Sequence, residues 1–362
     1  MLTIIVVILT LLIILIGALL IMSPGKTKPL LDKNGDLVAG SISEKTHVSI
    51  NGVEQGMFIR SKNPANPVLL FLHGGPGMPE HFLNDRYPTG LEEHFSVCWW
   101  ERRGSGLSYT HDIPPETMTV EQTISDTVEV ANYLRDRFGK DKVYLMAHSG
   151  GTFFGIQAAA RRPDLFHAYI ALSQMANQLR SEILAYEFML KKYRENGDGR
   201  MVRRLEKVPV TGTVPLPAAY MALRDEAMHG LGIGTTRDMR SVVRGIFFPI
   251  WFDREYTLGE KVNIWRGKAF SSRMLWDEMV ATDLTMMVTK LSLPTYFISG
   301  RFDYTVSISE ARSYFNKIMA PIKGFYTFED SAHSPMFEEP DRMMKIMLED
   351  VMHHTIALAD QV

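Results

Sequence analysis

Short apolar runs alternate with amphipathic segments along the chain from about residue 45 onward. Runs of five or six apolar residues are typical of strands that helices cover on both faces of a parallel sheet. The first two segments flank Asn51-Gly52, a dipeptide that favours a two-residue hairpin turn. The pattern predicts strands at 46–50, 56–60, 68–72, 95–100, 142–147, 168–172, 294–298 and 324–328.

The clearest helix is predicted over residues 119–138, where apolar residues recur at helical spacing. Thr119 and Gln122 have the spacing of a capping box, and Gly139 stands where the helix should stop. Strand–helix alternation of this kind predicts an α/β fold, with a mostly parallel sheet and helices on both faces.

One long segment, 175–290, interrupts the alternation and is rich in Met, Arg and helix-forming residues. We interpret it as a helical cap over the sheet. The core of the fold is then predicted to comprise residues 45–174 and 291–358.

The first 22 residues carry no charge and are almost entirely apolar. A helix of that length is about 33 Å long, enough to cross a hydrocarbon core of about 30 Å. We predict a transmembrane anchor over 1–22 and a flexible tether over 23–44, which is rich in Pro and Gly. A cleaved signal peptide and a buried soluble helix are the alternatives, but no basic residue precedes the apolar run.

Membrane sidedness rests on a few charges. Lys26, Lys28 and Lys33 follow the apolar run, which slightly favours a cytoplasmic position for the body.

Over the whole chain, 39 basic residues balance 41 acidic ones, so no basic surplus points to nucleic-acid binding. The single cysteine, Cys98, excludes an intrachain disulfide and lies in an apolar run, where we expect it to be buried.

A serine lies between the strand predicted at 142–147 and a segment that can begin a helix near Gly150. The sequence AHSGG at 147–151 matches the nucleophile elbow G-x-S-x-G, with Ala147 in place of the first glycine. Small neighbours are needed because the strand turns sharply into the helix. Ser149 is the predicted nucleophile, and a serine in an ordinary strand–helix loop is the alternative.

A glycine-rich loop, HGGPG at 73–77, directly follows the strand predicted at 68–72. Acyl transfer passes through an oxyanion that needs about two N–H donors. We predict the N–H groups of Gly75 and Gly150 for this role, the alternative being a plain Gly-Pro turn.

No His, Cys, Asp or Glu cluster has metal-ligand spacing and no phosphate-binding loop is present, so we expect neither metal nor cofactor.

Two stretches, LFLHGGPG at 70–77 and WERRGSGLS at 100–108, resemble the proline iminopeptidase branch of the α/β-hydrolases. That family typically shows HGGPG and then WDQRGSGxS at this spacing. The resemblance covers about residues 45–355 and implies an α/β-hydrolase fold. Two departures stand out: Glu101-Arg102 replace Asp-Gln, and Gly150 stands where the family commonly has Trp after the nucleophile.

The triad of this fold runs in the chain order Ser, Asp or Glu, His. Asp303 lies just beyond the strand predicted at 294–298, where α/β sheets place functional groups. The resemblance places the base at His333, after the last predicted strand. A solvated or helix-capping aspartate and a surface histidine are the alternatives.

The leading functional hypothesis is therefore a serine hydrolase, by resemblance an aminopeptidase that cleaves N-terminal residues from a small-molecule or peptide substrate. An esterase or lipase-like hydrolase of small acyl esters and a catalytically idle binding protein are the alternatives. A buried substrate ammonium needs carboxylate partners. The cap offers Glu182, Glu187, Asp225, Glu226, Asp277 and Glu278.

Overall fold

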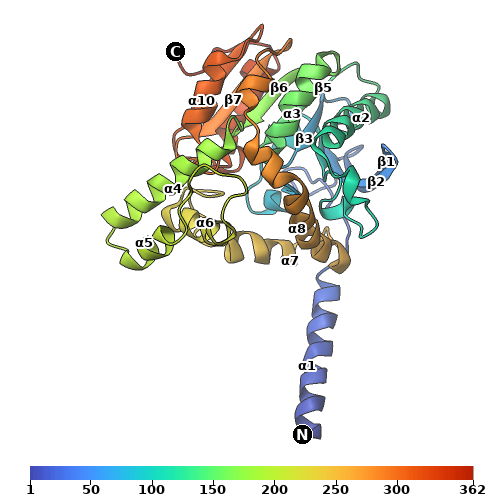
Figure 1. Ribbon diagram of the computed structural model, residues 1–362. Coiled ribbons are helices and arrows are strands. Elements are labelled where there is room, and N and C mark those ends of the chain that lie inside the picture. The colour runs from blue at the N-terminus through green and yellow to red at the C-terminus, as the bar shows by residue number, and fades with distance from the viewer. Residues whose placement is uncertain (362) are drawn as a thin grey trace.

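The computed structural model describes residues 1–361, whose centre is one eight-stranded sheet (Figure 1). The strand order is β1-β2-β4-β3-β5-β6-β7-β8. Strand β2 pairs antiparallel with β1 and β4, and the other pairs are parallel. All eight predicted strands are present: β1 Ile42–Ile50, β2 Val53–Ser61, β3 Val68–Leu72, β4 Ser96–Trp100, β5 Val143–His148, β6 Phe166–Leu172, β7 Thr295–Gly300 and β8 Lys323–Phe328.

The α-helices are numbered in the order in which they occur along the chain. They are α1 Leu2–Ile21, α2 Val120–Phe138, α3 Gly150–Arg161, α4 Gln178–Glu195, α5 Gly199–Glu206, α6 Ala218–Leu231, α7 Phe248–Phe252, α8 Leu258–Ala281, α9 Leu284–Met287, α10 Ile308–Lys317, α11 Pro335–Glu338 and α12 Pro340–Ile346. A π-helical turn, Val243–Phe247, leads directly into α7.

The central strand β3 is buried on both faces, as its unbroken apolar sequence predicts. Leu70 and Leu72 belong to one hydrophobic core, which α2, α3 and α10 help to cover. Leu69 and Phe71 point to the other face and belong to a second core, which α8, α11 and α12 help to form. Successive side chains of a strand point to opposite faces, so one short apolar run supplies both cores.

The opening hairpin has the predicted two-residue turn. Ile50 pairs with Val53 across β1 and β2. Asn51 and Gly52 between them both have positive φ, 46° and 78°. A type I′ turn requires positive φ at both central positions, and Asn-Gly is the dipeptide that best tolerates it.

Helix α2 begins and ends where its sequence predicts, but its first turn differs in one respect. The Thr119 side chain accepts a hydrogen bond from the Gln122 backbone N–H at 3.1 Å, and Gly139 ends the helix with left-handed dihedrals. The Gln122 side chain, however, donates to Asp126 at 2.8 Å instead of reaching back to Thr119. The expected capping box is thus half formed, because the buried Asp126 carboxylate takes the Gln122 amide.

Between β6 and β7 the chain forms α4 to α9, which lie to one side of the sheet (Figure 1). These helices have a hydrophobic core of their own, which includes Met189, Tyr220 and Leu223. A buried ion pair crosses this region: Arg224 of α6 contacts Glu182 of α4 at 2.7 Å. The helical segment between β6 and β7 therefore has internal packing that can hold residues in fixed positions over the sheet.

Helix α1 projects away from the body (Figure 1). Its span Thr3–Ile21 has a mean hydropathy of 3.5 and is 0% buried, so it is long and apolar enough to cross a membrane, as a signal sequence also is. The connection after it is not loose. Lys261 donates to Ser23 at 2.8 Å, and Glu255 accepts from the Lys28 N–H at 2.7 Å. The segment after α1 therefore differs from the flexible tether expected from its Pro and Gly content, because side chains distant in sequence form hydrogen bonds with it.

Candidate active site

Ser149 occupies the sharp turn from β5 into α3. Its backbone has φ 51° and ψ −125°, a conformation that side-chain-bearing residues rarely adopt. The Ser149 N–H donates to the Leu172 carbonyl of β6 at 2.9 Å, which fixes the turn against the sheet. A Cβ at Gly151 would lie 2.3 Å from the Leu72 carbonyl oxygen, so only glycine allows α3 to pass this close to β3. The local geometry is that of the predicted elbow.

The glycine loop after β3 lies directly against the elbow. Gly75 has φ +88°, and a Cβ at Gly150 would stand 1.7 Å from the Gly75 carbonyl oxygen. No side chain therefore fits at position 150 with the loop in this place. The Trp that the resembling family commonly has after its nucleophile is therefore excluded here.

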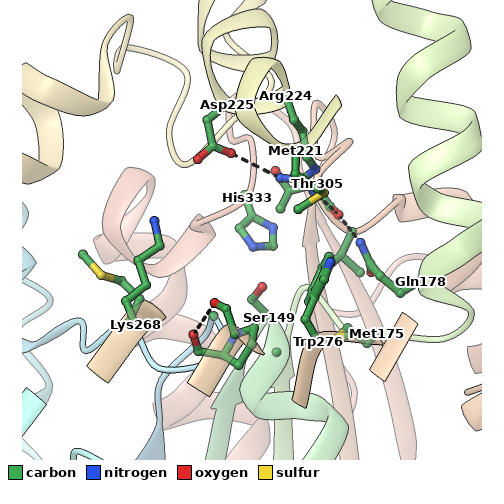
Figure 2. A pocket seen from close by; sticks show the side chains of 16 residues that line it. Ser149, Met175, Gln178, Met221, Arg224, Asp225, Lys268, Trp276, Thr305 and His333 are labelled. Atoms are coloured by element: carbon green, nitrogen blue, oxygen red, sulfur yellow. Dashed lines mark hydrogen bonds and ion pairs between the residues drawn. The ribbon is translucent and has the colours of Figure 1, made fainter. Parts of the chain in front are cut away.

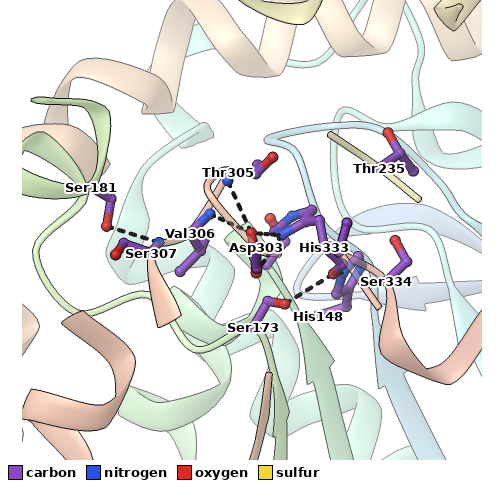
Figure 3. A network of polar contacts seen from close by, with 12 residues as sticks. His148, Ser173, Ser181, Thr235, Asp303, Thr305, Val306, Ser307, His333 and Ser334 are labelled. Carbon is purple, nitrogen blue, oxygen red and sulfur yellow. Dashed lines mark hydrogen bonds and ion pairs between the residues drawn. The ribbon is translucent and has the colours of Figure 1, made fainter. Parts of the chain in front are cut away.

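His333 and Asp303 are joined at the carboxyl end of the sheet (Figure 3). The His333 Nδ1 lies 3.0 Å from each Asp303 carboxylate oxygen. Asp303 is fully buried, and its Oδ1 also accepts from the backbone N–H groups of Thr305 and Val306 at 2.9 and 3.0 Å. These bonds hold the carboxylate in one orientation, so the ring of His333 is fixed with its Nε2 directed away from Asp303.

A second histidine–carboxylate pair supports this arrangement. His148 Nδ1 lies 2.8 Å from Glu80 Oε2, and His148 Nε2 lies 2.7 Å from the His333 carbonyl oxygen. Both partners are acceptors, so the ring satisfies both only when it carries two protons. Burial disfavours the charged ring, but the charge and hydrogen bond of Glu80, together with the His333 carbonyl and the charge of Asp303, raise the pKa of His148.

Glu80 also reaches the glycine loop, because its Oε1 accepts from the Gly74 N–H at 2.6 Å. The pair thus connects the loop to the backbone of His333. Glu80 was not foreseen from the sequence, where its only signal is a lone carboxylate soon after HGGPG. His148 links Glu80 to the backbone of His333.

We expect the alkaline limb of the kcat/KM–pH profile to move to lower pH in Glu80→Gln. Loss of the carboxylate lowers the pKa of His148, so one of its two bonds is lost at a lower pH. An opposite charge at this range moves a pKa by about 1–3 pH units, which sets the expected size. The exposed Asp330→Asn is the control, and an unchanged profile in Glu80→Gln would exclude this coupling.

The motif at 100–106 braces the glycine loop from the other side. Arg102 donates to the carbonyl oxygens of His73 and Gly74, and the His73 Nε2 accepts from the Arg102 N–H at 3.2 Å. His73 therefore has a structural role, because its ring bonds to the backbone of Gly74 and Arg102. Glu101 beside it accepts from the Tyr256 hydroxyl, and from the Leu107 N–H at 2.6 Å.

Glu101 should make the protein less stable as the pH rises. Burial raises the pKa of Glu101 from 4.5 to about 8. The folded state then holds a proton that the unfolded state releases, so stability falls from about pH 4.5 to 8, by ~1.4 kcal/mol for each pH unit in that interval. Glu101→Gln keeps the shape and should remove this loss, as measured by urea unfolding at pH 5 and 9. The exposed Glu129→Gln is the control, and equal pH dependence in Glu101→Gln and wild type would contradict the prediction.

A cavity of about 320 Å³ lies over Ser149 and is lined by both Ser149 and His333 (Figure 2). Gly75 and Gly150 also line it. The remaining walls come mainly from α6, α8 and the start of α4, and include Met78, Met175, Gln178, Met221, Arg224, Asp225, Lys268, Ser272 and Trp276. The structure therefore brings all the predicted site residues except the buried Asp303 to one cavity, with Asp303 directly behind His333.

Of the six candidate cap carboxylates, Asp225 is the one that lines this cavity within residues 1–361. Glu182 accepts hydrogen bonds from Arg224 and Tyr220, and Glu226 forms an ion pair with Arg204. The other three, Glu187, Asp277 and Glu278, are exposed.

Two further polar residues at the cavity were not foreseen from the sequence. Gln178 is buried, and its Nε2 donates to Glu182 and to the Thr305 carbonyl, both at 2.9 Å. Both partners are acceptors, so the amide cannot be flipped, and Gln178 Oε1 is left without a partner among the described residues. Lys268 also reaches toward the cavity (Figure 2). No group of three or more His, Cys, Asp or Glu within residues 1–361 could hold a metal ion.

This fold and this site define a class of protein. Residues 67–340 match the alpha/beta hydrolase fold family, and the chain belongs to that family. Within it, the chain falls in the proline iminopeptidase-like branch, as the sequence resemblance implied.

Two relatives and one solved structure illustrate the relation. The chain is 31% identical over 314 residues to a Bacillus subtilis (strain 168) protein named "Probable aminopeptidase YbaC", covering 87% of this chain and 98% of that one. It is 24% identical to the proline iminopeptidase of Saccharolobus solfataricus, covering 79% and 84%. The crystal structure of the proline iminopeptidase from Mycobacterium smegmatis superposes with a TM-score of 0.63 at 16% identity, covering 86% and 98%, which shows the shared fold.

Proposed function

We propose that this protein is a serine hydrolase that works through an acyl-enzyme. Ser149 attacks the substrate carbonyl, His333 takes its proton, and Asp303 holds the imidazole in the tautomer that can accept it. The N–H groups of Gly75 and Gly150 stabilise the oxyanion. The observation that carries the proposal is that a serine on a strained elbow and an aspartate-bonded histidine line one cavity.

The substrate class is a peptide or arylamide with a free N-terminus. Relatives named as aminopeptidases support this, as does the chemistry of the cavity. A substrate ammonium is a donor with a positive charge, and the cavity offers it the Asp225 carboxylate. Methionine side chains and Trp276 form the apolar remainder of the wall, which suits a small apolar N-terminal residue.

The proposal is tested by comparing proline arylamide with its N-acetylated form and with a short acyl ester. Free-amine substrates should be cleaved best, because N-acetylation removes the charge that Asp225 would pair with. Equal turnover of the free and N-acetylated arylamides would contradict the aminopeptidase proposal and favour the esterase alternative. The loss of a side chain at Gly150, compared with the resembling family, is the observation that keeps that alternative open.

Asp225→Asn should reduce kcat/KM for the free-amine arylamide by about 10- to 100-fold. The range corresponds to the loss of one charge-assisted hydrogen bond at a half-exposed site. Turnover of the N-acetylated arylamide should not change. Glu226→Gln is the matched control, since Glu226 is adjacent in sequence but pairs with Arg204 on the outside. A similar loss on both substrates would mean that Asp225 does not bind the amine.

We also propose that α1 anchors the protein in a membrane. Its length and hydropathy support this, as does the absence of any acidic or basic residue in its first and last turns. The three lysines that follow it favour the cytoplasmic side for the body.

A further inference from the structure

The segment Val243–Phe252 is a short apolar helix that exposes several large hydrophobic side chains. Its exposed side carries Val243, Phe247, Phe248 and Phe252, with 54%, 39%, 44% and 58% of their surface exposed. We call these four residues the aromatic face. Phe248 and Phe252 stack with ring centroids 5.8 Å apart, while Ile250 between them is fully buried. Large side chains clustered in this way on a surface indicate an interaction site.

The aromatic face lies beside the end of α1. Lys261 donates to the Trp251 carbonyl at 2.9 Å, to the Met22 carbonyl at 3.2 Å and to Ser23 Oγ at 2.8 Å. One ammonium therefore joins the apolar segment to the two residues that directly follow α1. Figure 1 shows α7 on the side of the body from which α1 leaves, lying across the direction of α1. A membrane crossed by α1 would consequently run along α7.

Several basic residues lie within the segment or close to it. Arg244 lies within the segment, Arg240 and Arg254 lie just outside it, and the Gly25 N–H beside Lys26 donates to the Arg254 carbonyl at 3.1 Å. Arg240, Arg244, Arg254 and Lys26 are exposed, and none forms an ion pair within residues 1–361. Aromatic side chains with a basic rim are the composition of helices that lie in the headgroup region of anionic membranes.

We propose that the aromatic face is a membrane-contacting surface that inserts into the lipid headgroup region beside α1. The proposal rests on the anchor proposed above. A bilayer fits this surface better than a protein partner does, because α1 already brings lipid to its edge and the free cations match anionic headgroups.

The same segment also reaches the site. Ile246, on its inner side, lines a second cavity of about 120 Å³ together with Ser149 and His333. Lipid contact on the outer side and the wall of the site on the inner side thus belong to one short helix. Insertion of the aromatic face would fix the candidate site close to the membrane surface.

The test uses the full chain in vesicles of phosphatidylcholine and phosphatidylglycerol. Phe248→Cys and Phe252→Cys are each labelled with an environment-sensitive NBD fluorophore; Cys98 is fully buried and stays unlabelled. Met286→Cys and Met319→Cys are the controls, because both positions are apolar and exposed, at 78% and 59%, but lie away from α7. Labels at 248 and 252 should show blue-shifted emission and lose intensity with nitroxide lipids, whereas the control labels should do neither.

Labels at 248 and 252 that behave like the controls would overturn the proposal. So would labels shielded from aqueous iodide but not quenched by nitroxide lipids, since that pattern indicates a protein partner or a second copy. An alkaline carbonate wash of the unlabelled full chain tests the anchor separately. Lipid quenching at 248 with loss of the protein in the wash would refute the anchor and leave the aromatic face supported.

Discussion

Replacing Ser149 or His333 with alanine should lower kcat by about 10⁴- to 10⁶-fold, the range found when a nucleophile or its base is removed from a triad. In the proposed mechanism the acyl-enzyme forms on Ser149, and His333 takes the serine proton. The double variant should be little worse than either single one, because the two residues act in one step. Steady-state turnover of a proline arylamide measures all three variants.

Covalent labelling gives the same prediction a second readout. A fluorophosphonate probe should modify wild type at Ser149 and leave Ser149→Ala unlabelled, because only a serine activated by a base reacts in this way. Ser309→Ala, which changes an exposed serine of α10, is the control and should label like wild type. Persistent labelling of Ser149→Ala would refute the assignment of the nucleophile.

Removing residues 1–22 should transfer the protein from the membrane pellet to the supernatant after an alkaline carbonate wash. The wash removes peripheral contacts, including those proposed for the aromatic face, so it reports on α1 alone. The shortened chain should keep its turnover of soluble substrates, because the helix window is 0% buried and Ser23, which Lys261 binds, is retained.

A matched control replaces residues 1–22 with an unrelated apolar sequence of the same length and should remain in the pellet. Two results would contradict the anchor. One is full-length protein in the supernatant, and the other is a mature N-terminus beyond Met22, as cleavage of a signal peptide would leave.

The sheet could be predicted because each strand is a short apolar run whose burial on two faces leaves a clear pattern. The elbow and the glycine loop could be predicted because both need small residues at fixed places. Glu80 and His148 could not be paired in advance, since 68 positions separate them and neither sits in a periodic pattern. The contacts of segment 23–41 could not be predicted either, because its partners Glu255 and Lys261 are more than 200 positions away in the sequence.

The cap carboxylates show a second limit of the sequence. Asp225 and Glu226 are neighbours of the same chemical type, yet one lines the cavity and the other pairs with Arg204 outside. Successive residues of a helix point about 100° apart, so which of the two faces inward depends on how α6 is rotated. That rotation is set partly by the buried Arg224–Glu182 pair, a contact between distant parts of the chain.

The close approach of the Gly75 carbonyl to Gly150 limits how this protein and its relatives could be interconverted. The Cβ of a Trp at position 150 would clash with the Gly75 carbonyl, so Gly150→Trp alone should displace the loop and reduce activity. The same change would be tolerated only after the loop at 74–78 had moved. The effect of Gly150→Trp therefore depends on whether the loop has changed first. A chimaera that takes the elbow of a Trp-containing relative must also take that relative's glycine loop.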